Sequence, residues 1–288
     1  MSTIRKINKI LTAKPTLEGA GVKLKRVFGY YEMPLLDPFL LLDNFGSDNP
    51  DDYIAGFPWH PHRGIETVTY MLEGEVEHSD SLGNKGVIYS GDVQWMTAGS
   101  GIVHQEIPKR FEGRMRGFQL WVNLPKTNKM MDPRYRDVKG ETIPEFSPNP
   151  NVNIKIIAGQ LNGTRGPVQD LVVDTDYFDI TVSPNSEFEV STKNGYKTFA
   201  FVFQGSGYFD ENKKDILKAD HLAVFEDEGV VKVSTEDDPV RFLLVSGKPL
   251  NEPIAWRGPI VMNTDEELAV AFQEYRNGTF IKQTLEHG

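Results

Sequence analysis

Two histidines separated by one residue lie in the segment Phe57-Pro-Trp-His-Pro-His-Arg-Gly64. On a β-strand, residues i and i+2 face the same side, so His60 and His62 can both approach one metal ion. Taken alone, such a pair is weak evidence, because it also arises by chance or as a hydrogen-bonded polar pair.

A second pair with the same spacing follows some forty residues later, in Gly101-Ile-Val-His-Gln-Glu-Ile-Pro108. His104 and Glu106 would again share one face of a strand. Three imidazoles and one carboxylate suit Fe, Mn, Cu or Zn, whereas Ca and Mg prefer oxygen ligands alone. The chain has no cysteine, so any metal must be held by nitrogen and oxygen atoms. The two pairs together predict a metal site.

The elements around these pairs have the composition of β-strands. Val22 to about Val122 contains short segments rich in β-branched and aromatic residues, such as 66–73, 87–89 and 117–122, separated by glycine-containing turns. No long helical periodicity interrupts them. We therefore predict an all-β fold of the sandwich or barrel type.

Residues 125 to about 150 are rich in proline and polar side chains, which is typical of a connection between domains. After it, the pattern of the first half returns weakly: in an alignment of residues 66–78 with 197–209, Thr67 falls on Thr198 and Gly74 on Gly205. This predicts two jelly-roll domains in tandem, with boundaries at 1–133 and 134–288.

A few short helices are expected, one of them near the C-terminus. Thr264-Asp-Glu-Glu267 is a capping box, and Gly278 is a stop signal. Leu268, Phe272 and Tyr275 would form its apolar face. We assign this helix to the second domain, with a role in closing the core.

The composition excludes several classes of protein. The formal net charge is −10, which argues against direct binding to nucleic acid. No segment resembles a signal peptide, and none is apolar for long enough to span a membrane. A cytoplasmic enzyme or regulator is the expectation.

Longer motifs around the two pairs resemble those of a known family. Gly56-x3-His60-x-His62-x3-Glu66-x7-Gly74 and Gly91-Asp92 through Gly101-x2-His104 resemble the two cupin motifs. The amino-acid sequences of segments 60–74, 91–106 and 116–125 are similar to those of the pirin family of bicupins. The resemblance covers nearly the whole chain and is most specific in the first 130 residues.

The resemblance implies which carboxylate binds the metal. Typical cupins use a carboxylate from the first motif, here Glu66, whereas pirins use one from the second, here Glu106. We therefore expect His60, His62, His104 and Glu106 as ligands, with Glu66 behind them orienting an imidazole. In the second domain the equivalent positions hold Ser191, Lys193, Lys232 and Ser234, so we expect that domain to bind no metal.

The same resemblance implies a reaction. Pirins are similar to cupin quercetin 2,3-dioxygenases, which would make the chain an Fe(II) enzyme that cleaves a flavonol with O2. Glu106 would then also accept the flavonol proton. Mn, Ni, Cu or Zn would suit the same ligands. The alternative is a regulator whose iron acts as a redox switch that controls binding of a protein partner.

The remaining histidines and the tryptophans are expected to play structural roles. His78, His221 and His287 lack the spacing of the predicted ligands. Trp59, Trp95 and Trp121 could line a pocket, but a place in the barrel core is favoured.

Overall fold

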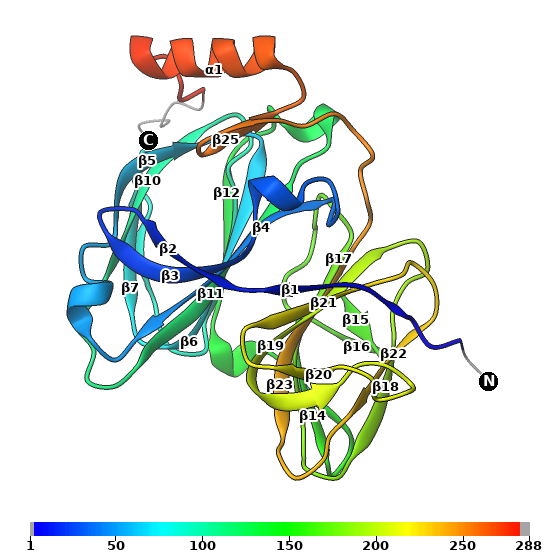
Figure 1. Ribbon diagram of the computed structural model, residues 1–288. Helices are drawn as coiled ribbons and strands as arrows, with labels where there is room; N and C mark the ends of the chain where they lie inside the picture. Colours follow the sequence, from blue (N-terminus) through cyan, green and yellow to red (C-terminus); the bar gives the residue numbers. More distant parts are fainter. Residues whose placement is uncertain (1–2, 283–288) are drawn as a thin grey trace. The chain divides into compact units, whose positions relative to one another are not determined.

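The computed structural model describes residues 3–282, which form two compact units (Figure 1). One unit comprises Pro15–Tyr31, Phe39–Glu141 and Leu250–Gly288, and we call it the histidine unit because it contains His60, His62 and His104. The other comprises Met1–Lys14, Glu32–Pro38 and Thr142–Pro249, and we call it the second unit. Short 3-10 turns are η1 (Tyr30–Glu32), η2 (Pro50–Asp52), η3 (Lys126–Asn128) and η4 (Gly140–Thr142).

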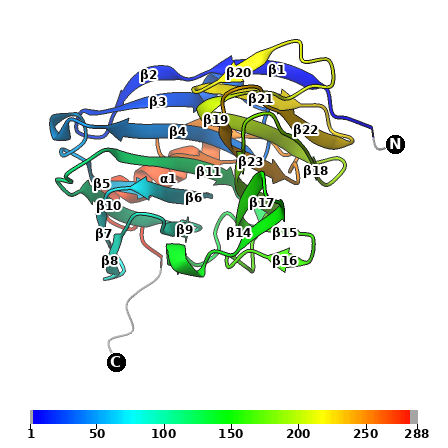
Figure 2. The same ribbon diagram turned by 90° about the horizontal axis from the view of Figure 1, so that it is seen from below.

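The histidine unit contains a seven-stranded and a four-stranded antiparallel sheet. In spatial order, the larger sheet consists of β12 (Arg134–Val138), β9 (Val93–Thr97), β6 (Ile65–Glu73), β11 (Met115–Asn123), β4 (Phe39–Ser47), β3 (Val22–Phe28) and β2 (Lys14–Glu18). The smaller one consists of β5 (Phe57–His62), β10 (Ile102–Pro108), β7 (Val76–Asp80) and β8 (Lys85–Ile88). Successive strands β2, β3, β4 and β11 are seen side by side in Figure 2.

Strand β10 shows why this unit can position chemical groups. Its residues alternate between buried and half-buried, starting with buried Ile102, so His104 and Glu106 both point inward. Apolar neighbours such as Met71, Val76 and Met115 form a core cluster in this unit.

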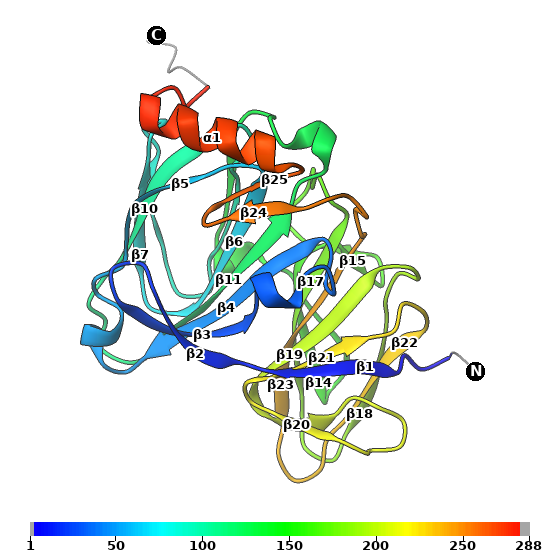
Figure 3. The ribbon, with the colours of Figure 1, turned by 45° about the horizontal axis from the view of Figure 1, so that its top comes forward.

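A hairpin and a helix complete the histidine unit. The hairpin consists of β24 (Ala255–Arg257) and β25 (Ile260–Met262), which lie next to α1 (Asp265–Asn277) in Figure 3. Thr264 and Glu267 form the expected capping box, and Gly278 ends the helix in the left-handed conformation. Leu268 is buried as predicted, but Tyr275 is 40% exposed, so it does not belong to the buried face.

The second unit is built around a ten-stranded sheet system. Its main order is β1 (Ile7–Thr12), β21 (His221–Phe225), β19 (Lys197–Tyr208), β23 (Val240–Gly247), β17 (Thr175–Val182), β14 (Val152–Ala158) and β13 (Glu145–Asn149). The remaining three strands of this system are β18 (Glu187–Ser191), β20 (Ile216–Lys218) and β22 (Val230–Ser234), and a separate hairpin consists of β15 (Gln160–Leu161) and β16 (Thr164–Arg165). Ile154, Phe178 and Leu244, together with residues at the same parity, form its core.

The repeat seen in the sequence corresponds to equivalent strands. β6 lies between β9 and β11, and β19 lies between β21 and β23. Gly74, which directly follows β6, and Gly205, which lies within β19 just after a register shift, both have positive φ, at 103° and 71°. The prediction of two tandem cupin domains in a mostly β chain is confirmed.

The two units do not divide the chain between residues 133 and 134, as expected from the sequence. The N-terminal β1 belongs to the second unit, because it pairs with β21. Helix α1 belongs to the histidine unit, because Leu268 and Ala271 pack with Ile260 and Met262. The proline-rich connection is not structureless, since β12 and β13 lie within it, and β13 tolerates Pro148 as an edge strand.

Candidate metal centre

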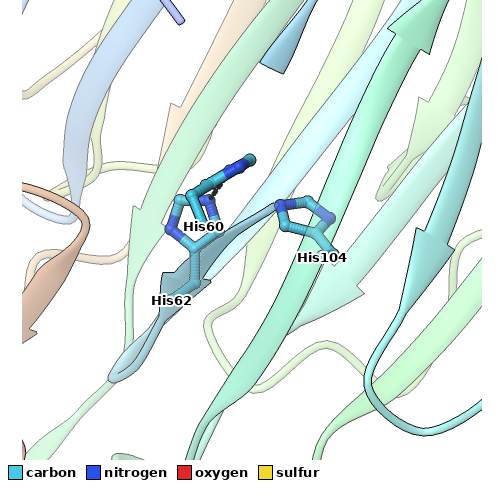
Figure 4. A group of neighbouring side chains, drawn as sticks. All are labelled: His60, His62 and His104. Carbon is cyan, nitrogen blue, oxygen red and sulfur yellow. Dashed lines mark hydrogen bonds between the residues drawn. The ribbon is translucent and has the colours of Figure 1, made fainter. Parts of the chain in front are cut away.

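Three histidines converge in the histidine unit. His60 and His62 come from β5 and His104 from the adjacent β10, where it lies directly opposite His60 (Figure 4). Each offers a ring nitrogen, and these atoms lie within 4.8 Å of one another. The predicted i and i+2 geometry therefore holds for β5, and the pairing of β5 with β10 brings the third imidazole to the same place.

Backbone carbonyls determine which nitrogens of the β5 histidines face the cluster. His60 Nδ1 is 2.8 Å from the oxygen of Pro58, and His62 Nδ1 is 3.2 Å from that of Pro259. A neutral ring whose Nδ1 donates to a carbonyl keeps its lone pair on Nε2, and this is the form in which both Nε2 atoms could bind one metal. They are 3.0 Å apart. Two nitrogens that bind one transition metal at about 2.1 Å and at right angles would be about 3 Å apart.

His104 lacks any hydrogen bond. Both of its ring nitrogens are buried and have no partner among the described residues. A buried imidazole without partners is costly, so it calls for a ligand that the protein itself does not supply. A metal ion at the cluster would satisfy one nitrogen of His104.

The electrostatics of the site favour neutral imidazoles. Burial lowers the pKa of His62 well below its usual value, and His60 lowers it further. Burial also lowers the pKa of His104, with additional effects of His62, His60 and His78. Neutral imidazole is the form that binds metals.

Glu106 lies outside the group formed by the three histidines. The carboxylate is buried, and its contacts are long: Gln119 Nε2 is 3.3 and 3.4 Å from its two oxygens, and Thr69 Oγ1 is 3.4 Å away. Hydrogen bonds of this length are weak. The carboxylate is therefore lightly held, on the same face of β10 as His104.

Glu66 has a different place from the one expected. It accepts hydrogen bonds from Trp95 Nε1 at 2.9 Å and Thr97 Oγ1 at 2.5 Å, and Arg136 lies 3.9 Å away. The expected orienting bond to an imidazole is wrong: carbonyls of Pro58 and Pro259 take that role. The reason is register, since Glu66 pairs with Thr97 on β9.

A cleft of about 720 Å³ opens onto two of the three histidines, and His104 and Glu106 are not among its lining residues. Its lining includes His60, His62, Gln119, Trp59, Trp121 and Trp256. The expectation that all three earlier tryptophans belong to the core is wrong for Trp59, which is 52% exposed, and for Trp121. It is correct for Trp95, which is fully buried.

Sequence reasoning missed the contribution of the C-terminal hairpin. Pro259 and Trp256 are nearly two hundred residues away from His62, and no motif marks them. Gln119 was missed too, although it lies two residues before Trp121 on β11 and its Oε1 accepts a hydrogen bond from Trp121 Nε1 at 3.2 Å.

The other histidines do not join the cluster. His78 is buried, stacks on Tyr135 and lies 3.0 Å from Gln94 Nε2. His221 contacts the carbonyl of Lys218 in the second unit. His287 is outside the described residues.

Comparison with known sequences identifies the family. The pirin family matches residues 21–122, and the pirin C-terminal cupin domain matches residues 177–281. The chain is a member of the pirin family.

Relatives of this pirin extend over its whole length. It is 42% identical to a Pseudomonas aeruginosa protein named "Putative quercetin 2,3-dioxygenase", with 96% of this chain and 99% of that protein covered. It is 43% identical to a pirin-like protein of Caulobacter vibrioides, with the same coverage. A solved structure of a quercetin 2,3-dioxygenase from Acinetobacter baumannii superimposes with a TM-score of 0.90 at 32% identity, covering 96% of this chain and 99% of that one. In a cupin of this family, the three-histidine cluster indicates a metal site.

Proposed function

We propose that this pirin is a flavonol 2,3-dioxygenase that opens the central ring of a flavonol such as quercetin with O2 and releases CO. The observation that supports this most is the cluster of His60, His62 and partnerless His104 beside a cleft of about 720 Å³. The names of the Pseudomonas and Acinetobacter relatives point to the same activity.

The metal in this proposal is Fe(II), with His60, His62, His104 and Glu106 as ligands. The three imidazoles present nitrogen lone pairs, and the weakly bonded carboxylate of Glu106 is free to turn toward them. Mn, Ni, Cu and Zn suit the same donor set, so metal analysis of the purified protein decides between them. Bound there, the ion would supply Lewis acidity toward a substrate oxygen and reactivity toward O2.

Protein groups would prepare the substrate. Glu106 would accept the proton of the flavonol hydroxyl, leaving a flavonolate and a protonated carboxyl. Gln119, whose amide lies near both Glu106 oxygens, would donate to the oxygen that does not take up the proton. The barrel wall formed by Trp121 would exclude water from the reacting face.

The size of the cleft favours the enzyme over the redox-switch alternative. Sites for small molecules have volumes of roughly 300–1,000 Å³, and a three-ring flavonol fits within that range. A regulator that signals through a protein partner does not need such a cleft beside the metal.

The test is anaerobic loading with Fe(II), followed by measurement of O2 consumption and of flavonol absorbance with quercetin. The wild type should consume O2 as the flavonol disappears, and His104→Ala should bind no iron and show no turnover. His221→Ala, which removes a histidine far from the cluster in sequence, should behave as the wild type. Stoichiometric iron without turnover would reject the dioxygenase and favour the redox switch.

A further inference from the structure

The hairpin β24–β25 is held tightly against the end of β5. Val261 N donates to the carbonyl of Arg63, and Lys129 Nζ donates to the oxygens of Val261 and Gly64 at 3.0 Å each. Gly64 has φ of 77°, and a Cβ there would overlap the oxygen of Val261. The hairpin therefore has a fixed place directly after the histidine strand.

One face of the cleft is a continuous row of aromatic rings that ends on this hairpin. The ring of His62 contacts Trp121 at a centroid distance of 5.1 Å, Trp121 contacts Trp256 at 5.9 Å, and Trp256 contacts Tyr30 at 5.7 Å. All four residues line the cleft. The row leads from the metal ligand outward to Tyr30, which is 57% exposed.

Trp256 is the most suitable ring in this row for binding a ligand. Its Nε1 donates to the carbonyl of Gly258 at 2.7 Å, which restrains the indole without a ligand. Trp121 Nε1 likewise donates to Gln119 Oε1, but the Trp121 ring already makes an edge contact with the ring of His62, with an angle of 87° between the two ring planes. A preoriented indole loses little conformational freedom on binding, so stacking on it is efficient.

Charged groups line the same cleft. Arg26 pairs with Glu18 at 2.8 Å and with both oxygens of Asp43 at 2.8 and 2.9 Å. Each carboxylate oxygen has a second lone pair that can accept a bond from a ligand hydroxyl. The cleft thus combines an aromatic wall with hydroxyl acceptors.

We propose that Trp256 is the stacking platform for one ring of a planar, hydroxylated aromatic ligand, and that the β24–β25 hairpin is a specificity element of the site. This inference rests on the proposed function for its choice of ligand. A hairpin near the C-terminus would then recognise the molecule that reacts beside His60 and His62, which belong to the first motif.

The experiment measures quercetin binding by calorimetry to the Fe(II)-loaded protein without O2, together with the iron content of each variant. Trp256→Ala should weaken binding roughly five- to a hundredfold, the range for loss of one stacked aromatic contact. Trp256→Phe should stay within about threefold of the wild type, because it retains a ring. Iron should remain at the wild-type level in both variants.

The matched control is Tyr89→Ala, which removes an aromatic ring that is 47% exposed and does not line the cleft. It should leave the quercetin affinity unchanged. Wild-type affinity in Trp256→Ala would overturn the inference, as would a loss of affinity that merely follows a loss of iron, or a wild type that does not bind quercetin.

The two proposals fail separately. Binding that depends on Trp256 without O2 consumption would reject the dioxygenase and retain the ligand platform. Turnover with an unchanged KM for quercetin in Trp256→Ala would retain the dioxygenase and reject the platform.

Discussion

At the scale of single residues, the site depends on imidazoles that stay neutral inside the protein. Burial is the main reason why His62 and His104 have lowered pKa values, and neighbouring histidines add to it. Two carbonyls lie within hydrogen-bond distance of Nδ1 of His60 and His62, which favours the tautomers that leave Nε2 for a metal. These features prepare nitrogen lone pairs before any metal binds.

The lowered pKa values predict the pH dependence of the metal-free protein. Below about pH 6.5 the unfolded chain takes up protons that folded His62 and His104 do not, so stability should fall as the pH decreases. Urea unfolding between pH 7.5 and 5 should show this fall. His104→Gln should have a shallower pH dependence, and equal slopes in both proteins would contradict the assignment of this effect to His104.

Glu106→Gln tests the proton acceptor. The amide keeps the shape of the side chain but cannot accept the flavonol proton, so kcat should fall by roughly 10²- to 10⁴-fold in the iron-loaded variant. Steady-state O2 consumption at saturating quercetin is the measurement. Thr69→Val, which removes only the long 3.4 Å contact to Glu106, is the control and should retain most of the activity. Full turnover by Glu106→Gln would exclude this role.

At the scale of elements, the close approach of Gly64 to β25 determines whether Pro259 reaches His62. Gly64→Ala should destabilise the protein by about 3 kcal/mol, because alanine is strained at the positive φ of residue 64 and its Cβ would also displace the backbone of the hairpin. Metal affinity should fall with it, as the bond between His62 and Pro259 is lost. Thermal unfolding and metal titration measure the two effects.

The hairpin itself supplies the matched control. Gly258 also has positive φ, 55°, but a Cβ there would meet nothing within 4 Å. Gly258→Ala should cost only the strain of the left-handed conformation, about 1–2 kcal/mol, with metal affinity retained. Equal losses of affinity in both variants would show that close packing at Gly64 is not the cause.

Lys129 also connects Gly64, which lies just after β5, with β25. Burial lowers the pKa of Lys129 to about 7, and its amino group donates to the oxygens of Gly64 and Val261 and to Asn123 Oδ1. Lys129→Met preserves the length of the side chain but leaves three buried oxygens without this donor, so we expect a loss of about 3 kcal/mol in the free energy of unfolding. An exposed lysine of the same unit, Lys85→Met, should change stability by less than about 0.5 kcal/mol.

At the scale of the whole molecule, one of two similar units holds the three-histidine cluster. In the second unit Lys193 pairs with Asp174 and Asp176, and Lys232 pairs with Glu187. We predict one metal ion per chain by native mass spectrometry. Hydrogen exchange should slow on metal binding in β5 and β10 but not in β18 and β22, and slowing in both pairs of strands would contradict a single site.

No helix in the described part of the chain is long and apolar enough to cross a bilayer. Most of the regular structure consists of β-strands, as the short segments of β-branched and aromatic residues in the sequence predicted. The segments 66–73, 87–89 and 117–122 correspond to β6, β8 and β11, and Thr264 caps α1. These features depend on side-chain alternation and local hydrogen bonding, which neighbouring residues determine.

The sequence by itself determined the two cupin domains, the family, and the residues from which the three-histidine cluster is built, because strand parity is a local property. Only the tertiary structure decided that Pro259 rather than Glu66 orients an imidazole, that Trp121 and Trp256 line a cleft, and that α1 packs in the histidine unit. Those outcomes depend on which distant strands pair and in which register. Contacts between residues nearly two hundred positions apart leave no periodic signal in the chain that forms them.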